Sequence, residues 1–531
     1  MHGNRKISEY APDGRTSETV FATSGFSVGI QQGVAVSLWV KHPERKGEPV
    51  VRFRDDINDA RAVERRAHLL ASLEAKRFDA QYEKSNPLKD NRWSFRPLDV
   101  SDRYMAWPKL IDLCGILPIC GYKENRSFAM INDSRSVIVE RMIMYFNRDV
   151  EWDALATLQT GLTANAAGFD ARNMRERAIH HDHFEECRVL RYSLHPLENK
   201  WCYFPRIPGL WNRNRPSLFA HHVPGNSYVV CRSVQVSNPE GTPFYYTSCL
   251  GDFHHVRGQA HHFPLHLKVG QDHRPSGDKN VELVLPGIDD RADRIIANLP
   301  PSARTYLASL GLPDPDTYQA TAELIWYHAL AIGYSPAYLV ENADGIRQDW
   351  PRIPLPKTKD SLIASAILGR QVAALLDTEA PVPGVTAGKI KEGLKIVAVF
   401  QRVDGKPAKP ESGDLDLTTG WGHGGKGGII MPGKGKLVRR DDGAYDIFLN
   451  AVSCWRNVPE AVWDYTIGGY QVIKKWLSYR EKPLLGRGLT PDEVRYVTEI
   501  TRRLAAMVAL QASLDDNYRK VIKATYSWPK N

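Results

Sequence analysis

The spacing of hydrophobic positions near the start of the chain changes from two residues to three or four. Residues 34–40 (VAVSLWV) alternate branched residues with small or aromatic ones and end at polar residues, which predicts a largely buried strand. From 59 to 77 apolar residues recur at helical spacing among Glu, Arg and Ala, which predicts an amphipathic helix. Its apolar side consists of Val63, Leu70 and Leu73. A strand, a neighbour supplied by 20–21 and 26–30, and one helix form too little core to stand alone, so we expect residues 1–76 to complete a larger sheet.

The rest of the chain has a mixed pattern of helices and strands. Residues 77–94 are polar and irregular and are interpreted as a linker, and short strands, helices and loops follow to about residue 300. Residues 320–378 are largely helical in pattern, with interruptions at 335–336 and 351–356. The sequence 490–493 (TPDE) is a capping box with proline at the first helical position, so a long helix is predicted to begin there. Its apolar stripe is Val494, Val497, Ile500, Leu504, Met507 and Val508.

Composition narrows the class of protein. The 531 residues are 42% hydrophobic and 25% charged, which excludes a disordered or collagen-like chain and is compatible with about two to four domains. Lys and Arg outnumber Asp and Glu by 70 to 61, and the net charge of +9 favours nucleic acid or another polyanion as partner. The seven cysteines are scattered without a C-x-x-C pair, as in a reducing cytoplasm. Because neither a secretory signal nor a membrane-spanning run is present, we expect a cytoplasmic location and no membrane partner.

Two patterns suggest chemistry that the surrounding residues do not support. Residues 420–426 (GWGHGGK) match a phosphate-binding P-loop up to the lysine, but Gly427 follows where Ser or Thr must hold the metal ion. Histidines cluster at 180–183, 221–222 and 254–262 without the ligand spacing of a metal site, and doublets on a strand point to opposite faces. A metal-dependent hydrolase that uses these histidines stays open as an alternative function.

Basic residues interleaved with aromatic ones are more informative. One such cluster lies within residues 188–215 and a second within 474–480. Arg and Lys neutralise phosphates while aromatic planes pack on sugars or extruded bases, although the same mixture also occurs on ordinary solvated surfaces. Both clusters are therefore candidates for contact with nucleic acid.

Several strings along the chain resemble one protein family. Residues 2–6 (HGNRK), 12–14 (PDG) and 29–36 (GIQQGVAV) resemble the segment that closes the methyltransferase domain of Type ISP restriction-modification enzymes and related N6-adenine DNA methyltransferases. Residues 121–126 (GYKENR) resemble the family's G-x-K-T-x-R-D element, with Glu124 and Ser127 departing from the usual Thr and Asp.

The matches continue to about residue 480, in the family's order. Residues 191–203 (RYSLHPLENKWCY) are similar to its Y-R-P-F-D-x-R-W-x-Y element. The strings 335–338 (SPAY) and 349–356 (DWPRIPLP) resemble the S-P-x-Y and D-F-P-R-I-P-L pair of its target-recognition domain. Residues 462–477 (VWDYTIGGYQVIKKWL) resemble its V-x-x-Y-x-L-G-G-Y-Q-V-L-K-K-W-L element, in which the two glycines are expected to permit close backbone packing.

The resemblance implies a fold and a division into domains. Residues 1–76 would be the last strands and helix of an incomplete Rossmann-like methyltransferase domain, and residues 95–531 a large target-recognition domain of mixed α+β structure. The glycine-rich loop for S-adenosylmethionine and the [D/N/S]-P-P-[Y/F] tetrad are absent from the sequence, so no catalytic residue is assigned. We expect no cofactor in this chain, S-adenosylmethionine in the complete enzyme, and no methylation by this chain alone.

The resemblance also implies a function in phage defence. The chain would recognise a sequence in double-stranded DNA, and the complete enzyme would flip and methylate an adenine. Two alternatives stay open: a natural split subunit, whose methyltransferase or helicase-nuclease part is encoded separately, and a truncated enzyme. A non-functional remnant of a restriction system is a further alternative. The residues predicted to contact DNA are Lys123, Arg126, Arg191, Trp201, Arg213, Arg215, Lys474, Lys475 and Arg480, with Lys436, Arg439 and Arg440 as weaker candidates.

Overall fold

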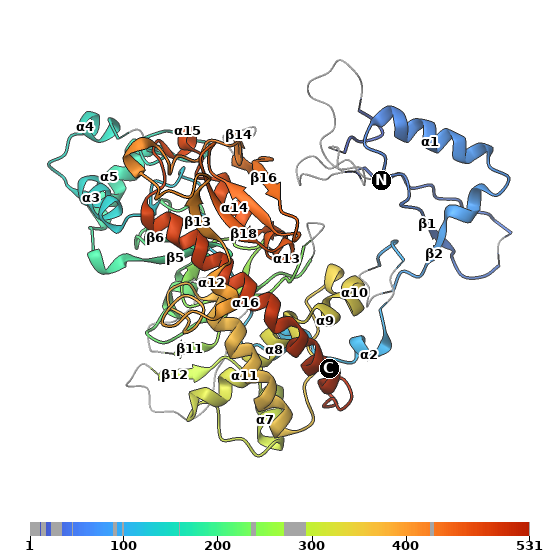
Figure 1. The fold of residues 1–531 in the computed structure, drawn as a ribbon. Coiled ribbons are helices and arrows are strands. Elements are labelled where there is room, and N and C mark those ends of the chain that lie inside the picture. Colours follow the sequence, from blue (N-terminus) through green and yellow to red (C-terminus); the bar gives the residue numbers. More distant parts are fainter. Residues whose placement is uncertain are drawn as a thin grey trace. The chain divides into compact units, whose positions relative to one another are not determined.

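The computed structural model describes residues 11, 17–22, 34–44, 46–88, 93–97, 100–158, 160–234, 240–269, 294–424 and 430–529. The chain divides into two compact units, whose elements are labelled in Figure 1. We call N-terminal unit the described residues up to Tyr104 together with 233–234 and Asn342–Asp349. The main unit consists of the described residues of Met105–Arg232, Glu240–Glu341 and Trp350–Asn531.

The N-terminal unit contains one short pair of strands. β1 (Val51–Phe53) pairs antiparallel with β2 (Glu83–Ser85), which lies inside the predicted linker. Gly345 in α10 (Ala343–Gln348) faces the Tyr104 ring, where an added Cβ would lie 2.3 Å from a ring carbon, so only glycine fits. The other elements here are α1 (Ala62–Glu74), the 3-10 turn η2 (Phe78–Gln81) and the start of α2 (Asp102–Met105).

The predicted strand at 34–40 is wrong. These residues have no strand pairing, and Leu38 and Trp39 are 89% and 77% exposed. Alternating side chains form a strand only when another segment pairs with the backbone and covers one face. The described ladder of this unit is taken up by β1 and β2. Of the predicted neighbours, Val20 and Phe21 lie in a turn, and 26–30 lies outside the described residues.

The predicted helix at 59–77 is confirmed as α1, but its apolar side is not covered. Val63, Leu70 and Leu73 are each more than 60% exposed. The side that α1 buries contains Arg65, whose guanidinium donates to Ser17 Oγ at 2.6 Å. Within the described part of this unit, the hydrophobic stripe therefore faces solvent.

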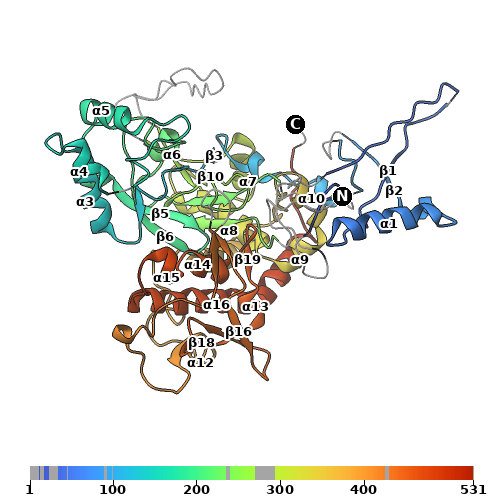
Figure 2. The same ribbon diagram turned by 90° about the horizontal axis from the view of Figure 1, so that it is seen from above.

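A mixed sheet lies at the centre of the first half of the main unit. Its strand order is β4 (Ile131–Asn132), β6 (Glu198–Tyr203), β5 (Val189–His195) and β9 (Leu250–Gly251), with β5 and β9 parallel. Helix α3 (Arg135–Phe146) packs on this sheet and against α5 (Ala171–His181), as Figure 2 shows. The buried core between them is rich in aromatic rings, and Phe204 stacks on Trp211 at 5.6 Å. Two short helices, α4 (Trp152–Ala156) and α6 (Pro216–Ala220), lie at its edge.

A second sheet contains the histidine pair His261 and His262. Its order is β3 (Ile119–Cys120), β10 (His261–Pro264), β7 (Tyr228–Cys231) and β8 (Tyr245–Thr247). On β10, His262 is fully buried whereas His261 is partly exposed, as expected for neighbours on a strand. A further pair, β11 (His266–Val269) and β12 (Arg294–Ala297), extends this region.

The helical region predicted at 320–378 is confirmed. α8 (Gln319–Gly333) packs against α11 (Lys359–Leu376), and Gly369 allows the approach because an added Cβ would lie 1.7 Å from the Tyr327 carbonyl oxygen. Between them, α9 (Pro336–Glu341) begins at the predicted break: Ser335 Oγ donates to Asp515 at 2.6 Å, and the Tyr338 hydroxyl donates to the Arg352 carbonyl. α7 (Pro301–Ser309) precedes them in the chain.

The C-terminal part adds a third sheet and the long last helix. The sheet order is β13 (Val399–Arg402), β18 (Ser453–Val458), β17 (Tyr445–Phe448) and β16 (Lys436–Arg439). The predicted helix is α16 (Pro491–Val521), capped by Thr490 and Glu493 as expected, and it packs against α11. The remaining elements are α12 (Glu392–Lys395), β14 (Gly422–Gly424), β15 (Ile430–Pro432), α13 (Glu460–Trp463), β19 (Thr466–Ile467), β20 (Tyr470–Gln471), α14 (Val472–Ser478) and α15 (Lys482–Leu485). The mixed α/β fold class is confirmed.

Candidate nucleic-acid interface

Two segments that are far apart in the sequence hold three predicted cations together. Lys123 and Arg213 form an antiparallel bridge in which each backbone N–H donates to the other's carbonyl, at 3.2 and 2.9 Å. The Tyr122 hydroxyl donates to the Arg215 carbonyl at 2.8 Å, and Arg215 Nε donates to the Gly121 carbonyl at 3.3 Å. An added Cβ on Gly121 would lie 2.4 Å from the Asp252 carbonyl oxygen, so this close approach requires glycine.

The ring of Phe253 supports two of these cations. The Arg213 guanidinium lies 4.7 Å and the Lys123 ammonium 6.0 Å from its centroid. The ring itself is buried, which fixes its position, and cation–π attraction then favours both charges above it. No described carboxylate forms an ion pair with Lys123, Arg213 or Arg215.

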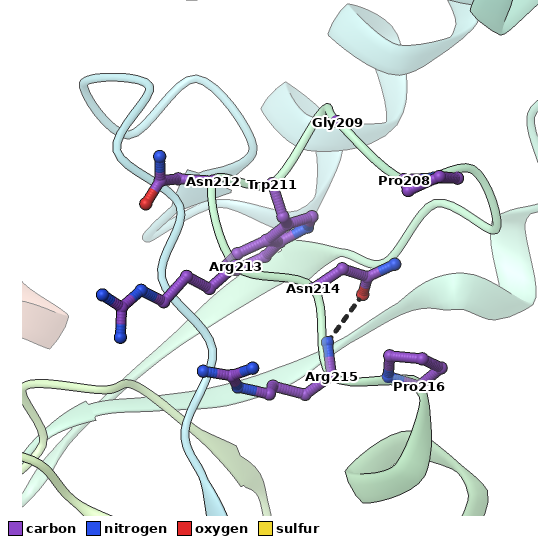
Figure 3. A pocket seen from close by; sticks show the side chains of 8 residues that line it. All are labelled: Pro208, Gly209, Trp211, Asn212, Arg213, Asn214, Arg215 and Pro216. Carbon is purple, nitrogen blue, oxygen red and sulfur yellow. Dashed lines mark hydrogen bonds between the residues drawn. The ribbon is translucent and has the colours of Figure 1, made fainter. Parts of the chain in front are cut away.

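A hollow opens beside this cluster. It has a volume of about 640 Å³, and Figure 3 shows the guanidinium groups of Arg213 and Arg215 extending to the same side of the loop that lines it. Asn214 instead bonds within the loop, where its carboxamide oxygen accepts from the Arg215 backbone N–H at 2.9 Å. The lining residues are Pro208, Gly209, Trp211, Asn212, Arg213, Asn214, Arg215 and Pro216.

Lys475 on α14 lies in an aromatic setting. Its ammonium is 4.4 Å from the Tyr479 ring and 5.2 Å from the Tyr470 ring, and it donates to the Tyr479 hydroxyl at 3.0 Å. Only 8% of the residue is exposed, and burial lowers the pKa of Lys475 to about 8, against the opposing effect of the Glu198 charge. Burial also lowers the pKa of the neighbouring Lys474.

The two predicted clusters meet around His254. Burial is the main cause that lowers the pKa of His254 to about 4, and the charges of Lys123, Arg213 and Lys475 contribute to this decrease. The Tyr470 hydroxyl donates to the His254 carbonyl at 3.0 Å, so the hairpin β19–β20 lies against this segment. We call basic surface the set Lys123, Arg213, Arg215, His254, Arg257, Lys474 and Lys475.

A glycine allows the hairpin β19–β20 to pack closely against residues 254–257. Gly468 has a φ of +53°, and an added Cβ would lie 2.3 Å from a Val256 methyl carbon. Its carbonyl accepts from the Arg257 backbone N–H at 2.8 Å, and the Arg257 guanidinium lies 5.3 Å from the Tyr470 ring. The close packing expected of the glycine pair is therefore observed at Gly468.

A buried acid lies beneath the basic surface. Asp252 accepts from the Tyr192 hydroxyl at 2.7 Å and from the His254 backbone N–H at 2.6 Å. Burial raises the pKa of Asp252 to about 7, while these hydrogen bonds and Lys123 oppose the increase. With this pKa the carboxyl is partly charged at neutral pH, within electrostatic range of Lys123.

Other predicted contact residues are engaged inside the protein. Arg480 is 3% exposed, stacks on Trp476 at 3.8 Å, and pairs with Glu198 at 2.8 Å and Asp133 at 3.2 Å. Arg126 is also buried, lies 3.7 Å from the Phe169 centroid, and donates to the Gly209 and Asn125 carbonyls.

Arg191 and Trp201 form a separate group on the central sheet. Arg191 makes a two-pronged ion pair with Glu379, with distances of 2.8 and 2.9 Å. Its guanidinium lies 5.1 Å from the Trp201 ring, and the guanidinium of Arg135 lies 5.7 Å from it.

The weaker candidates lie on and after β16. Lys436 lies 4.2 Å from the Phe448 centroid, Arg439 pairs with Glu460 at 3.1 Å, and Arg440 lies 3.5 Å from Asp442. Within the P-loop-like string, Gly425 and Lys426 lie outside the described residues.

Sequence reasoning did not assign Phe253, His254, Arg257 or Tyr470 to an interface. The sequence around the doublet 254–255 suggests only a possible metal ligand, because no neighbouring residue indicates that residues 123, 213 and 475 lie near it. Across the described residues, no three His, Cys, Asp or Glu side chains lie close enough together to bind a metal ion. Every described helix is too short or too polar to span a lipid bilayer.

Comparison with known proteins identifies a family. Residues 119–505 match the family model described as the Type ISP C-terminal specificity domain. No curated protein matches the chain.

Three solved structures have a similar fold. One is a nuclease-deletion mutant of the Type ISP restriction-modification enzyme LlaGI in complex with a DNA substrate mimic, with 16% identity, a TM-score of 0.52, and coverage of 89% of this chain and 33% of that one. The ATP-dependent Type ISP enzyme LlaBIII bound to DNA has 14% identity, a TM-score of 0.55 and coverage of 90% and 28%. A DrdV–DNA complex has 16% identity, a TM-score of 0.50 and coverage of 88% and 42%. This chain thus spans about a third of the length of these proteins.

Proposed function

Because this chain belongs to the family of Type ISP C-terminal specificity domains, we propose that it recognises a sequence in double-stranded DNA for a restriction-modification enzyme. The observation that carries the proposal is the basic surface, where Lys123, Arg213 and Lys475 converge on His254 and form no ion pair with a described carboxylate. The similar fold of three proteins whose structures were solved with DNA or a DNA substrate mimic supports the same assignment.

Some of the other predicted contact residues are already neutralised by carboxylates of the protein. Arg191 and Arg480 each have a carboxylate within 3 Å, so the protein itself neutralises them. Cations gathered on one surface repel one another and are stabilised when phosphates approach. A duplex supplies one negative charge per about 1.7 Å of its axis, which matches a surface of several cations better than a single small anion does.

The predicted contact residues then fall into two groups. Lys123, Arg213, Arg215, Lys474 and Lys475 contact DNA in this proposal. Arg126 and Arg480 hold the underlying structure, since both are buried and bonded to protein groups. Arg191 is held by its ion pair with Glu379, and its guanidinium packs on the Trp201 ring.

The complete enzyme is an N6-adenine DNA methyltransferase in this proposal, and residues 1–76 belong to its methyltransferase domain. The exposed apolar side of α1 supports this assignment, because Val63, Leu70 and Leu73 offer a surface for the rest of that domain. The part of the enzyme with the glycine-rich loop and the catalytic tetrad would hold S-adenosylmethionine, which would supply the methyl group. This chain's own residues bind and orient the duplex.

Salt dependence of duplex binding by the full chain tests the proposal. The equilibrium constant should fall with salt concentration, with a logarithmic slope of about −0.9 for each phosphate contacted. In the variant Lys123→Ala we expect weaker binding and a slope that is smaller by up to about 0.9, because one phosphate contact is lost.

The matched control is Arg206→Ala. This arginine is also exposed but is paired with Glu185 at 2.5 Å, so its removal should leave the slope unchanged. Binding that does not depend on salt, or an equal loss in the control, contradicts the proposal.

A further inference from the structure

The loop of residues 208–216 is held rigidly by its main chain. The Arg213 N–H donates to Lys123, and the Asn212 N–H donates to the Glu124 carbonyl at 3.1 Å. Arg126 fixes the other arm through the Gly209 carbonyl at 3.2 Å. The buried Trp211 anchors the middle, with its indole N–H on the Tyr203 carbonyl at 3.2 Å. A loop fixed in this way loses little conformational freedom when it binds, which favours precise recognition.

The side chains at the tip of this loop are exposed although its backbone is fixed. Asn212 and Arg213 are both exposed, and Figure 3 shows both reaching away from Trp211 toward the same side. No described group forms a hydrogen bond with the Asn212 carboxamide, whereas Asn214 is occupied within the loop. The Arg213 guanidinium lies over Phe253 at 4.7 Å, which orients the planar group and leaves its N–H edge open.

These side chains carry the chemistry that reads bases. In the major groove, guanine presents two acceptors, O6 and N7, to a two-pronged arginine, and adenine presents N7 and its amino group to an asparagine. A lysine ammonium is a point charge and suits phosphate better. We infer that Arg213 and Asn212 read base edges in the major groove, Arg213 at a guanine, whereas Lys123 and Lys475 bind phosphates. This inference rests on the proposed function and assigns sequence specificity to one loop of the basic surface.

The test is selection of bound duplexes from a random-sequence pool by the full chain, followed by measured affinities for the selected site and its single-base variants. Wild-type protein should select a site that contains a fixed G·C pair. Arg213→Lys keeps the positive charge but loses the two-pronged geometry, so discrimination at that one pair should fall by about 5- to 150-fold, the range of a good base contact. Asn212→Ala should relax a different position.

Lys123→Ala is the comparison variant. It should weaken binding to all duplexes by a similar factor and leave the selected sequence unchanged, because it removes a phosphate contact. Since Arg213→Lys is conservative and the backbone holds the loop, its duplex binding at low salt should stay within a few-fold of wild type, which shows that it folds.

The outcomes separate the inference from the proposed function. If wild-type protein binds no duplex, the proposed function fails and the inference fails with it. If wild type selects a site and Arg213→Lys selects the same site with equal discrimination, the inference alone is overturned. A uniform loss of affinity in Arg213→Lys, without relaxation at any position, would assign Arg213 to phosphate and also overturn it.

Discussion

Lys475 carries its charge in a place that is nearly closed to water. Tyr470 and Tyr479 surround its ammonium, and burial lowers the pKa of Lys475 to about 8. The residue therefore loses its proton within the range of ordinary buffers, unlike an exposed lysine. The same burial that holds the side chain in position makes its charge sensitive to pH.

This sensitivity predicts pH-dependent DNA binding. Between pH 7 and pH 9 Lys475 becomes neutral, so the logarithmic salt slope of duplex binding should decrease by up to about 0.9, the contribution of one phosphate contact. Arg stays charged in this range, so Lys475→Arg should show a smaller dependence. Equal slopes at both pH values in wild-type protein would show that Lys475 does not bind phosphate.

Lys475 also predicts that stability rises with pH, whereas the salt slope of DNA binding falls. The folded pKa of about 8 lies below the ordinary value of 10.5, so between these values the unfolded chain binds more protons and stability rises with pH. The free energy of unfolding of wild type should therefore increase relative to that of Lys475→Met as the pH rises from 8 to 10. Denaturant titrations of both proteins at each pH measure this difference, and a constant difference would contradict it.

At the scale of elements, helices could be predicted and short strands could not. α16 begins at Thr490 because its cap and its proline are local signals, and α8 and α11 follow their own apolar periodicity. The strands of the two sheets in the first half of the main unit are two to seven residues long, and partners distant in sequence define them: β5 pairs with β9 some 60 residues later. Residues 34–40 show the reverse case, since an alternating pattern without a paired partner forms no strand.

The close contact between α8 and α11 predicts that one added methyl group at Gly369 lowers the stability of the protein. Gly369→Ala places a Cβ 1.7 Å from the Tyr327 carbonyl oxygen, so the helices must separate at a cost of about 1–3 kcal/mol, the usual range for overpacking. Gly393→Ala in α12 is the control, because nothing lies within 4 Å of its added Cβ. Thermal unfolding should show a lower midpoint for the first variant and no decrease for the second. An unchanged midpoint in Gly369→Ala would show that the helices are not in close contact there.

At the scale of the whole molecule, sequence reasoning located the basic clusters but not their pairing. The resemblance to Type ISP specificity domains is confirmed by the family match over residues 119–505. Whether a given arginine is free depends on carboxylates far away in sequence, such as Glu379 for Arg191 and Glu198 for Arg480. Such long-range pairs leave no local pattern, so a single sequence cannot separate surface cations from buried ones.

The proposed place of residues 1–76 predicts that methylation requires the part of the enzyme that carries the S-adenosylmethionine loop and the catalytic tetrad. Expression of the chain together with that part should produce N6-methyladenine in host DNA at a defined sequence. The double variant Leu70→Lys, Leu73→Lys should lower this methylation and leave duplex binding by the chain unchanged, since both side chains are exposed. Val340→Lys, at a residue that is 78% exposed on α9, is the control and should methylate normally. Full methylation by the double variant would exclude α1 as the docking surface.

The way in which the loop 208–216 is attached has a consequence for evolution. Asn212 and Arg213 are held through their main-chain atoms, which every amino acid except proline supplies. Mutation can therefore replace either side chain while the loop keeps its shape. If the loop reads bases as inferred, single substitutions here change the recognised sequence without redesigning the surrounding protein.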